Sequence, residues 1–165
     1  MKKVLIVIFC VLLLSSCTKS TLIGDKLTDK ATEQQQEQVK QEVLKLLEQE
    51  YNQPFKIVDY NYDYSVHWKD KTCAIASMCP KVFYGVYSFK IQSINNPIII
   101  MQIRMEDTKE GLQWFKSNQL NNYYCSSLTQ IFRSKNQNYI NQDDLEKAKR
   151  YCDSRGQSYY KKWEK

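Results

Sequence analysis

Histidine and glycine are scarce in this sequence, which has one histidine, His67, and four glycines among 165 residues. A single histidine excludes a histidine pair for acid–base catalysis and any metal site built from several imidazoles. The chain also has no Gly-x-Ser-x-Gly nucleophile motif and no glycine-rich loop that could cradle a phosphate. Acid–base catalysis by two carboxylates leaves no such signature, because these groups are paired only in space. Nothing in the sequence points to it.

The sequence has no apolar stretch long enough to cross a membrane, which takes about 20 residues. The run from Val4 to Leu14 is shorter than this, and it follows Met1-Lys2-Lys3. A charged start, an apolar stretch and then the small residues Ser15 and Ser16 are the three regions of a secretory signal peptide. The sequence therefore predicts that the chain is exported.

The signal region ends in Leu14-Ser15-Ser16-Cys17. This tetrapeptide resembles the lipobox of bacterial lipoproteins: a branched residue, two small residues and a cysteine. The resemblance implies that the Cys17 thiol carries diacylglycerol, that a peptidase cuts before it, and that its amine is open to acylation, typically with palmitate. The competing interpretation is an ordinary signal peptide with a cysteine there by chance. Thr18 stands where lipoproteins of the inner membrane typically have Asp, so the resemblance implies the outer membrane.

The sequence has six cysteines, of which Cys10 is removed with the signal and Cys17 carries the lipid. The remaining four are Cys73, Cys79, Cys125 and Cys152. An even number in an exported chain predicts two disulfides, which fits an oxidising periplasm. Four cysteines allow three connectivities. Proximity along the chain favours Cys73–Cys79 together with Cys125–Cys152.

Charge is distributed unevenly along the mature chain. Removing Lys2 and Lys3 with the signal lowers the formal net charge from +6 to +4. Residues 17–132 contain 13 basic and 13 acidic side chains, whereas residues 133–165 contain nine basic and five acidic ones. Three of the basic residues share one expected helix: Lys147, Lys149 and Arg150. We expect them to form a weak cationic binding face toward anionic headgroups or an acidic partner.

The sequence indicates three parts: a signal peptide at residues 1–16, a lipidated tether at 17–29 and a single domain at 30–165. The tether is polar, and about a dozen flexible residues reach about 20 Å, enough to clear the lipid headgroups. The domain begins with a helix that either Asp29 or Thr32 can cap. Thr32 and Gln35 match a capping box, and an apolar stripe follows. Pro54 should stop this helix by Asn52-Gln53.

Alternating apolar and polar residues predict a half-buried antiparallel strand from Val58 to Trp68, with its even-numbered residues inside. Two more strands are expected at residues 82–91 and 98–105. The run Ile98–Met101 is apolar on both faces, which is typical of a central strand.

Helical periodicity returns after Thr108, and the sequence leaves open whether residues 108–133 form one helix or two that break at Asn121-Asn122. A last helix should begin after Asn141 and end at Gly156. We therefore predict an α+β domain in which an N-terminal helix packs on an antiparallel sheet of three or more strands, followed by C-terminal helices. This order loosely resembles cystatin-like and NTF2-like envelope domains.

Partial metal-binding patterns do not hold. The segment from Asp59 to Asp70 begins like a calcium loop, but its sixth position, which needs glycine, is Tyr64. Cys73, Cys79 and His67 lack the usual zinc spacing. We therefore expect no metal, no cofactor and no catalytic residue.

Aromatic residues are abundant, with twelve tyrosines and three tryptophans. Those in the segment 60–68 are expected in the core, the alternative being a carbohydrate platform. Near the C-terminus, Tyr159, Tyr160 and Trp163 accompany two lysines. This segment fits either an aromatic and cationic patch on headgroups or glycan, or a frayed polar tail.

The sequence thus predicts a lipid-anchored protein of the bacterial envelope, on the periplasmic face of the outer membrane, that is not an enzyme and binds another macromolecule. We expect a protein partner, with the membrane held through the lipid, and no nucleic acid. One role is an accessory component of an envelope assembly. The alternative is an immunity or inhibitor lipoprotein that neutralises a toxin or lytic enzyme in the periplasm, and a small envelope hydrolase is the third.

Overall fold

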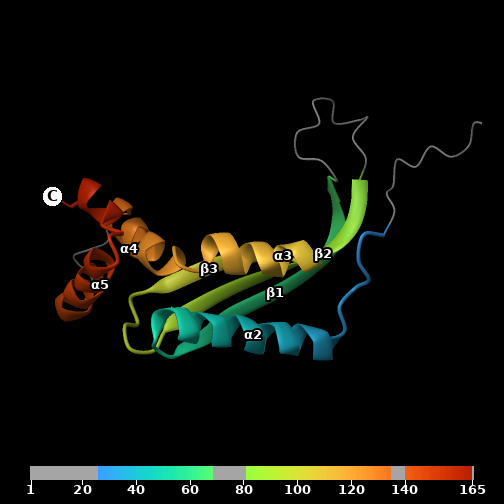
Figure 1. The fold of residues 1–165 in the computed structure, drawn as a ribbon, viewed down its shortest axis with the longest axis horizontal. Coiled ribbons are helices and arrows are strands. Elements are labelled where there is room, and N and C mark those ends of the chain that lie inside the picture. Colours follow the sequence, from blue (N-terminus) through green and yellow to red (C-terminus); the bar gives the residue numbers. More distant parts are fainter. Residues whose placement is uncertain (1–25, 69–80, 135–139, 165) are drawn as a thin grey trace, which may run out of the picture. The chain divides into compact units, whose positions relative to one another are not determined.

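The computed structural model describes residues 26–68, 81–134 and 140–164. Helix α2 (Glu33–Tyr51) comes first, followed by strands β1 (Phe55–Trp68), β2 (Lys81–Ser93) and β3 (Ile100–Glu106). Next come α3 (Lys109–Trp114), the π-helical turn η1 (Phe115–Gln119), α4 (Tyr123–Arg133), α5 (Gln142–Ser154) and the 3₁₀ helix η3 (Tyr159–Lys162). The strands form an antiparallel sheet in the order β1-β2-β3, which confirms the mixed α+β class (Figure 1). No helix in these ranges is both long and apolar enough to cross a membrane.

The chain divides into two compact units. The first comprises Met1–Leu27 and Ser65–Phe83, and in its described part Lys26 forms a parallel bridge with Phe83. In the same unit the Lys81 ammonium lies 4.8 Å from the centre of the Trp68 ring. The second unit comprises Thr28–Tyr64 and Tyr84–Lys165, and it contains the hydrophobic core. The two surface cavities described below both belong to this second unit.

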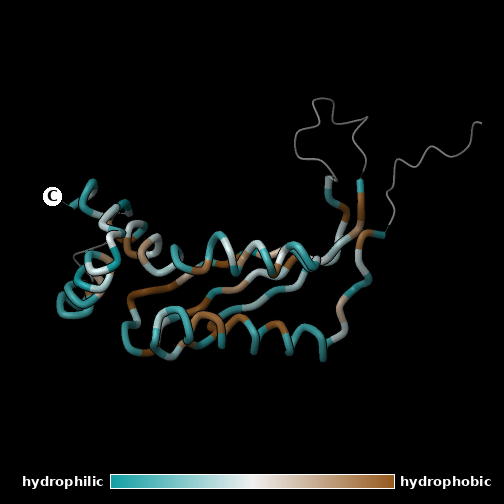
Figure 2. Tube along the Cα trace, in the orientation of Figure 1, coloured by the Kyte–Doolittle hydropathy of each residue, from teal (hydrophilic) through white to brown (hydrophobic). Residues whose placement is uncertain are grey.

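The core of the second unit joins one face of the sheet to the helices. Helix α2 contributes Val43, Leu47 and Tyr51, which recur at the helical period and are buried. Tyr51 also donates a hydrogen bond to the carbonyl of Leu120, so the end of α2 is tied to the segment that precedes α4. Figure 2 shows the matching pattern, with hydrophobic stretches on α2 and the strands between hydrophilic ones.

Strand β1 corrects the predicted strand at both ends. It begins at Phe55, and its alternation changes phase. Phe55 and Ile57, at odd-numbered positions, pack against the core, whereas from Tyr60 onward the core-facing residues are at even-numbered positions. Val58 is 44% exposed and Trp68 is 41% exposed, so the prediction that every even-numbered residue packs inside is wrong at both ends of the strand. A strict period of two fails where a long strand changes the surface that it covers.

Strand β3 corrects the predicted central strand. In the described sheet it pairs only with β2, from Val86↔Glu106 to Gln92↔Ile100, so β3 is an edge strand and β2 is central. Gln102 and Arg104 are exposed on its outer face. The run Ile98–Met101 gave the wrong prediction because its first two residues are not part of the strand. Ile98 and Ile99 lie before β3, and Ile99 is buried there.

The helix ends follow the sequence signals. Thr32 and Gln35 form the capping box of α2, and Asn52 ends that helix in the left-handed conformation. Asn141 caps α5, and Gly156 follows it with φ +69°. The open question about residues 108–133 is settled by two helices, α3 and α4, which are separated by the π-helical turn η1.

Candidate functional site

The structure joins Cys125 to Cys152, the pairing that proximity favoured. Their Cα atoms are 5.6 Å apart, both side chains are buried, and the bridge fixes α5 to α4. Cys17, Cys73 and Cys79 lie outside the described residues.

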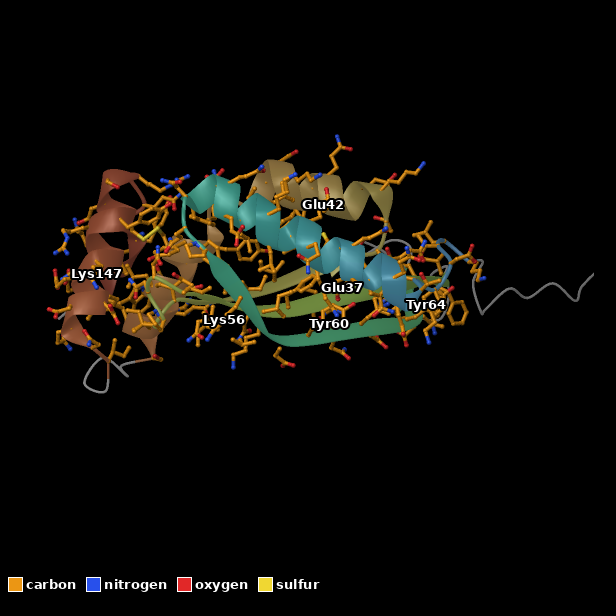
Figure 3. All side chains as sticks on the ribbon, turned by 90° about the horizontal axis from the view of Figure 1, so that it is seen from below. Glu37, Glu42, Lys56, Tyr60, Tyr64 and Lys147 are labelled. Carbon is orange, nitrogen blue, oxygen red and sulfur yellow. A yellow bond between two sulfur atoms is a disulfide. The ribbon has the colours of Figure 1, made fainter. Side chains whose placement is uncertain are left out.

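The expected cationic face on α5 is largely neutralised by ion pairs. Lys147 (labelled in Figure 3) lies 3.3 Å from Asp144. Lys149 lies 2.7 Å from Glu146 and 2.6 Å from Glu164. Its hydrogen bonds to these two carboxylates raise the pKa of Lys149, so it remains charged but paired. Arg150 alone of the three has no such partner within the described part of the chain. A charge count along the sequence could not show this, because the pairs form at helical spacing and across elements.

Of the C-terminal aromatic residues, Tyr160 packs into the core, so the segment is not a frayed tail, whereas Tyr159 and Trp163 are exposed. Tyr160 is fully buried, its ring lies 5.1 Å from that of Phe132, and its hydroxyl donates to Asp153 at 3.0 Å. Trp163 is partly exposed and lies under the Arg133 guanidinium at 5.2 Å. The segment therefore closes the core over α4 and leaves Tyr159 as its most exposed aromatic side chain.

No group of three metal-binding side chains occurs among the described residues. The imidazole of His67 lies 3.2 Å from the Ser65 hydroxyl. Asp59 and Asp63 are exposed on strand β1, as the strand interpretation of that segment requires.

A cavity of about 620 Å³ lies between α2 and the start of α3, with Tyr87 of the central strand among its lining residues. The chain before α2 and the first half of α2 form one side, and the beginning of α3 forms the other. The lining residues are Thr28, Asp29, Ala31, Gln35, Gln38, Val39, Glu42, Tyr87, Asp107, Thr108, Lys109 and Leu112. The exposed lining is mostly apolar, with amides and carboxylates placed among the apolar and aromatic groups, as is usual in binding sites.

Asp107 is a polar group of this cavity that the surrounding chain holds in place. It directly precedes Thr108, the N-cap of α3, and its backbone N–H donates to the Gly85 carbonyl at 2.7 Å. The Tyr62 hydroxyl donates to its Oδ2 at 2.8 Å, and Tyr87 lines the same cavity. One phenol and the backbone therefore fix Asp107 in place before any ligand arrives.

The tyrosines around Asp107 remain protonated at physiological pH. Burial, together with the hydrogen bond to Asp107, raises the pKa of Tyr62 to about 12. Burial and the nearby charge of Asp107 raise the pKa of Tyr60 to about 12. Tyr62 thus remains a donor to Asp107, and its own oxygen accepts from the Ala31 N–H at 2.9 Å.

The cations near this cavity do not neutralise Asp107. Lys116 forms an ion pair with Glu42 (labelled in Figure 3), at 2.7 Å. Lys109 is exposed at the start of α3 and has no ion pair in the described chain. Asp107 itself forms no ion pair within the described ranges. The buried hydroxyl oxygen of Thr28 also lacks a hydrogen-bond partner there. The cavity therefore presents a fixed carboxylate that no cation neutralises within the described part of the chain.

Sequence reasoning missed this site. Asp107 directly precedes Thr108, after which helical periodicity returns, and Tyr62 and Tyr87 fall within the predicted strands. The two tyrosines lie 45 and 20 positions from Asp107, so no local spacing connects the three. An Asp directly before a capping threonine was the one signal that a carboxylate stands at this helix start.

Comparisons of the chain with protein-family models, with curated proteins and with solved structures find no match.

Proposed function

We propose that this protein is a lipid-anchored component of the bacterial envelope that works as a non-enzymatic binding module. In this proposal residues 1–16 are the signal peptide, 17–29 the tether and 30–165 the binding domain, whose first helix covers one face of the sheet. The cavity beside Asp107 receives a basic group of a protein partner. The lipid places the domain on the periplasmic face of the outer membrane.

The observation that carries this proposal is the state of Asp107. A partly buried carboxylate is costly unless it is paired, and a hydrogen bond from a neutral phenol only partly offsets this cost. A lysine or arginine side chain of a partner would complete the site with a charge-assisted hydrogen bond. Gln35 and Gln38 add neutral donors and acceptors along the same wall.

Cys17→Ser tests the anchor. A serine cannot form the thioether to diacylglycerol, so the variant should accumulate as an uncleaved precursor and take up no palmitate label. Two or three acyl chains hold a protein stably in a bilayer, whereas one holds it only marginally. Metabolic palmitate labelling followed by electrophoresis measures both effects. Cys10→Ser is the matched control and should be labelled like the wild type; equal labelling of the Cys17 variant would overturn the anchor.

Photo-crosslinking in the native envelope tests the cavity. A benzoylphenylalanine at Gln38, which is exposed and lines the cavity, should give one discrete protein adduct. The same probe at Gln34, which is exposed on the same helix but does not line the cavity, should not. Asp107→Asn keeps an acceptor for Tyr62 and removes the charge, so it should lower the adduct yield about tenfold or more.

The identity of the adduct distinguishes the two roles. A resident envelope protein would support an accessory role in an assembly, and an adduct that forms only when a toxin or lytic enzyme is supplied would support an immunity or inhibitor role. Equal adducts from Gln38 and Gln34, or a yield that Asp107→Asn leaves unchanged, would contradict the cavity as the binding site.

A further inference from the structure

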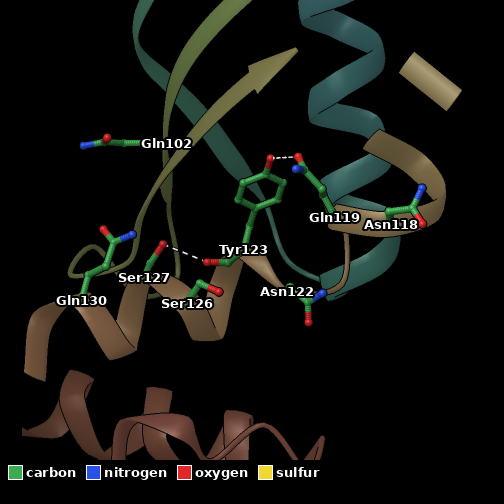
Figure 4. Close-up of a pocket in the computed structure, with 8 residues that line it drawn as sticks. All are labelled: Gln102, Asn118, Gln119, Asn122, Tyr123, Ser126, Ser127 and Gln130. Atoms are coloured by element: carbon green, nitrogen blue, oxygen red, sulfur yellow. Dashed lines mark hydrogen bonds between the residues drawn. The ribbon is translucent and has the colours of Figure 1, made fainter. Parts of the chain in front are cut away.

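A second depression in the surface differs sharply from the cavity beside Asp107 and shares no residue with it. It has a volume of about 230 Å³ and lies between strand β3, the turn η1 and helix α4 (Figure 4). Five of its eight lining residues carry side-chain amides: Gln102, Asn118, Gln119, Asn122 and Gln130. Tyr123, Ser126 and Ser127 supply hydroxyl groups. We call this depression the amide niche.

The amide niche contains no charged residue, although a quarter of the chain is charged. A neutral lining has no charge that could pair with a phosphate, a carboxylate or an ammonium group. Amides and hydroxyls are instead donors and acceptors at once. The chemical class that matches such a lining is a neutral ligand whose own groups both donate and accept, which is the property of sugar hydroxyls.

Part of this hydrogen-bonding capacity is unused. The Tyr123 hydroxyl donates to Gln119, and the Ser127 hydroxyl donates to the Tyr123 carbonyl at 2.9 Å (Figure 4). By contrast, the side chains of Gln102, Ser126 and Gln130 have no hydrogen-bond partner within the described part of the chain. The hydrogen-bonded side chains of Tyr123 and Ser127 stabilise the shape of the niche. The three side chains without partners are available to a ligand.

The backbone around the niche is also unusual. The Leu120 N–H donates to the Phe115 carbonyl at 3.1 Å, the i→i+5 bond of a π-helical turn, and Asn118 and Gln119 belong to that turn. Such widened turns occur often at functional sites. Asn118 in turn donates from Nδ2 to the backbone carbonyl of Trp114 at 3.2 Å, which ties its side chain to the helix that precedes the turn.

From these observations we propose that the amide niche binds a neutral sugar unit of a glycan. Gln102, Ser126 and Gln130 hydrogen-bond the sugar hydroxyls, and the π-helical turn places Asn118 and Gln119 around it. This site is independent of the protein partner proposed for the cavity beside Asp107.

The test is a titration of the full, lipidated protein in a detergent without a sugar headgroup, followed by nuclear magnetic resonance of the side-chain amide groups. The probes are chitotriose, maltotriose and the acidic trimer of galacturonic acid. One of the two neutral sugars should shift the amide signals of Asn118, Gln119 and Gln130 saturably, with a single dissociation constant. Chitotriose alone would assign the niche to N-acetylated glycan, and maltotriose alone to plain hexose chains.

Gln102→Leu combined with Gln130→Leu should weaken this binding about tenfold, because two hydrogen bonds to the sugar are lost and none within the protein. Gln113→Leu is the matched control, since Gln113 is exposed on α3 outside the niche, and it should bind like the wild type. The proposal is overturned if neither neutral sugar gives saturable shifts, if galacturonic acid binds as tightly, or if the double variant binds unchanged.

Discussion

Replacing Gly85 with alanine is expected to destabilise the protein by about 2–4 kcal/mol, because the new methyl group would overlap the ring of Tyr62. A Cβ atom at Gly85 would lie 2.1 Å from the Tyr62 hydroxyl and 2.4 Å from the ring carbons. The ring would have to leave its place over β2, and Tyr62 would lose its hydrogen bonds to Asp107 and Ala31. Chemical denaturation of the variant beside the wild type measures the change.

A double-mutant cycle shows whether Tyr62 is the cause. In a Tyr62→Ala background, Gly85→Ala should cost less than about 1 kcal/mol, because the clash is gone. Gly111→Ala provides the control: its Cβ would lie 2.1 Å from the backbone oxygen of Glu106, so Tyr62→Ala should not relieve its cost. If Gly85→Ala costs the same in both backgrounds, Tyr62 does not lie over Gly85.

Removing the disulfide between Cys125 and Cys152 is expected to lower the free energy of unfolding by about 3–4 kcal/mol. The two cysteines are 27 positions apart, so the bridge restricts a long loop of the unfolded chain. Cys125→Ala, Cys152→Ala and the double variant should all lose a similar amount. Alanine is preferred to serine because both positions are buried and a hydroxyl group there would have no partner. Thermal unfolding with and without reductant measures the loss.

The same variants test the pairing predicted for the other two cysteines. If Cys73 and Cys79 are bridged as the sequence predicts and Cys17 carries the proposed lipid, the native protein should react with no maleimide until it is denatured and reduced. Reductant should then still lower the melting temperature of the Cys125→Ala/Cys152→Ala variant. Two reactive thiols in the native protein would contradict the predicted Cys73–Cys79 bridge and leave Cys125–Cys152 in place.

Short sequence motifs correctly predicted the helix ends, whose stability depends on interactions within a few residues. The capping box of α2, the stop at Asn52, the cap at Asn141 and the end at Gly156 were all predicted correctly. Each depends on a hydrogen bond or a backbone conformation within a few residues, so a short motif contains all the information. The exposed ends of β1 and the edge position of β3 were missed, because burial depends on what covers a strand.

The site shows the same division. The sequence by itself determined the kinds of residue present, the helix caps, the lipobox-like signal and an even set of four later cysteines. Only the tertiary structure decided that Tyr62 fixes Asp107, that Lys149 is paired with Glu146 and Glu164, and that the amide niche forms at the π-helical turn. Charge pairing and hydrogen bonding fall off within a few ångströms, so distances in space decide them, and distances along the chain do not.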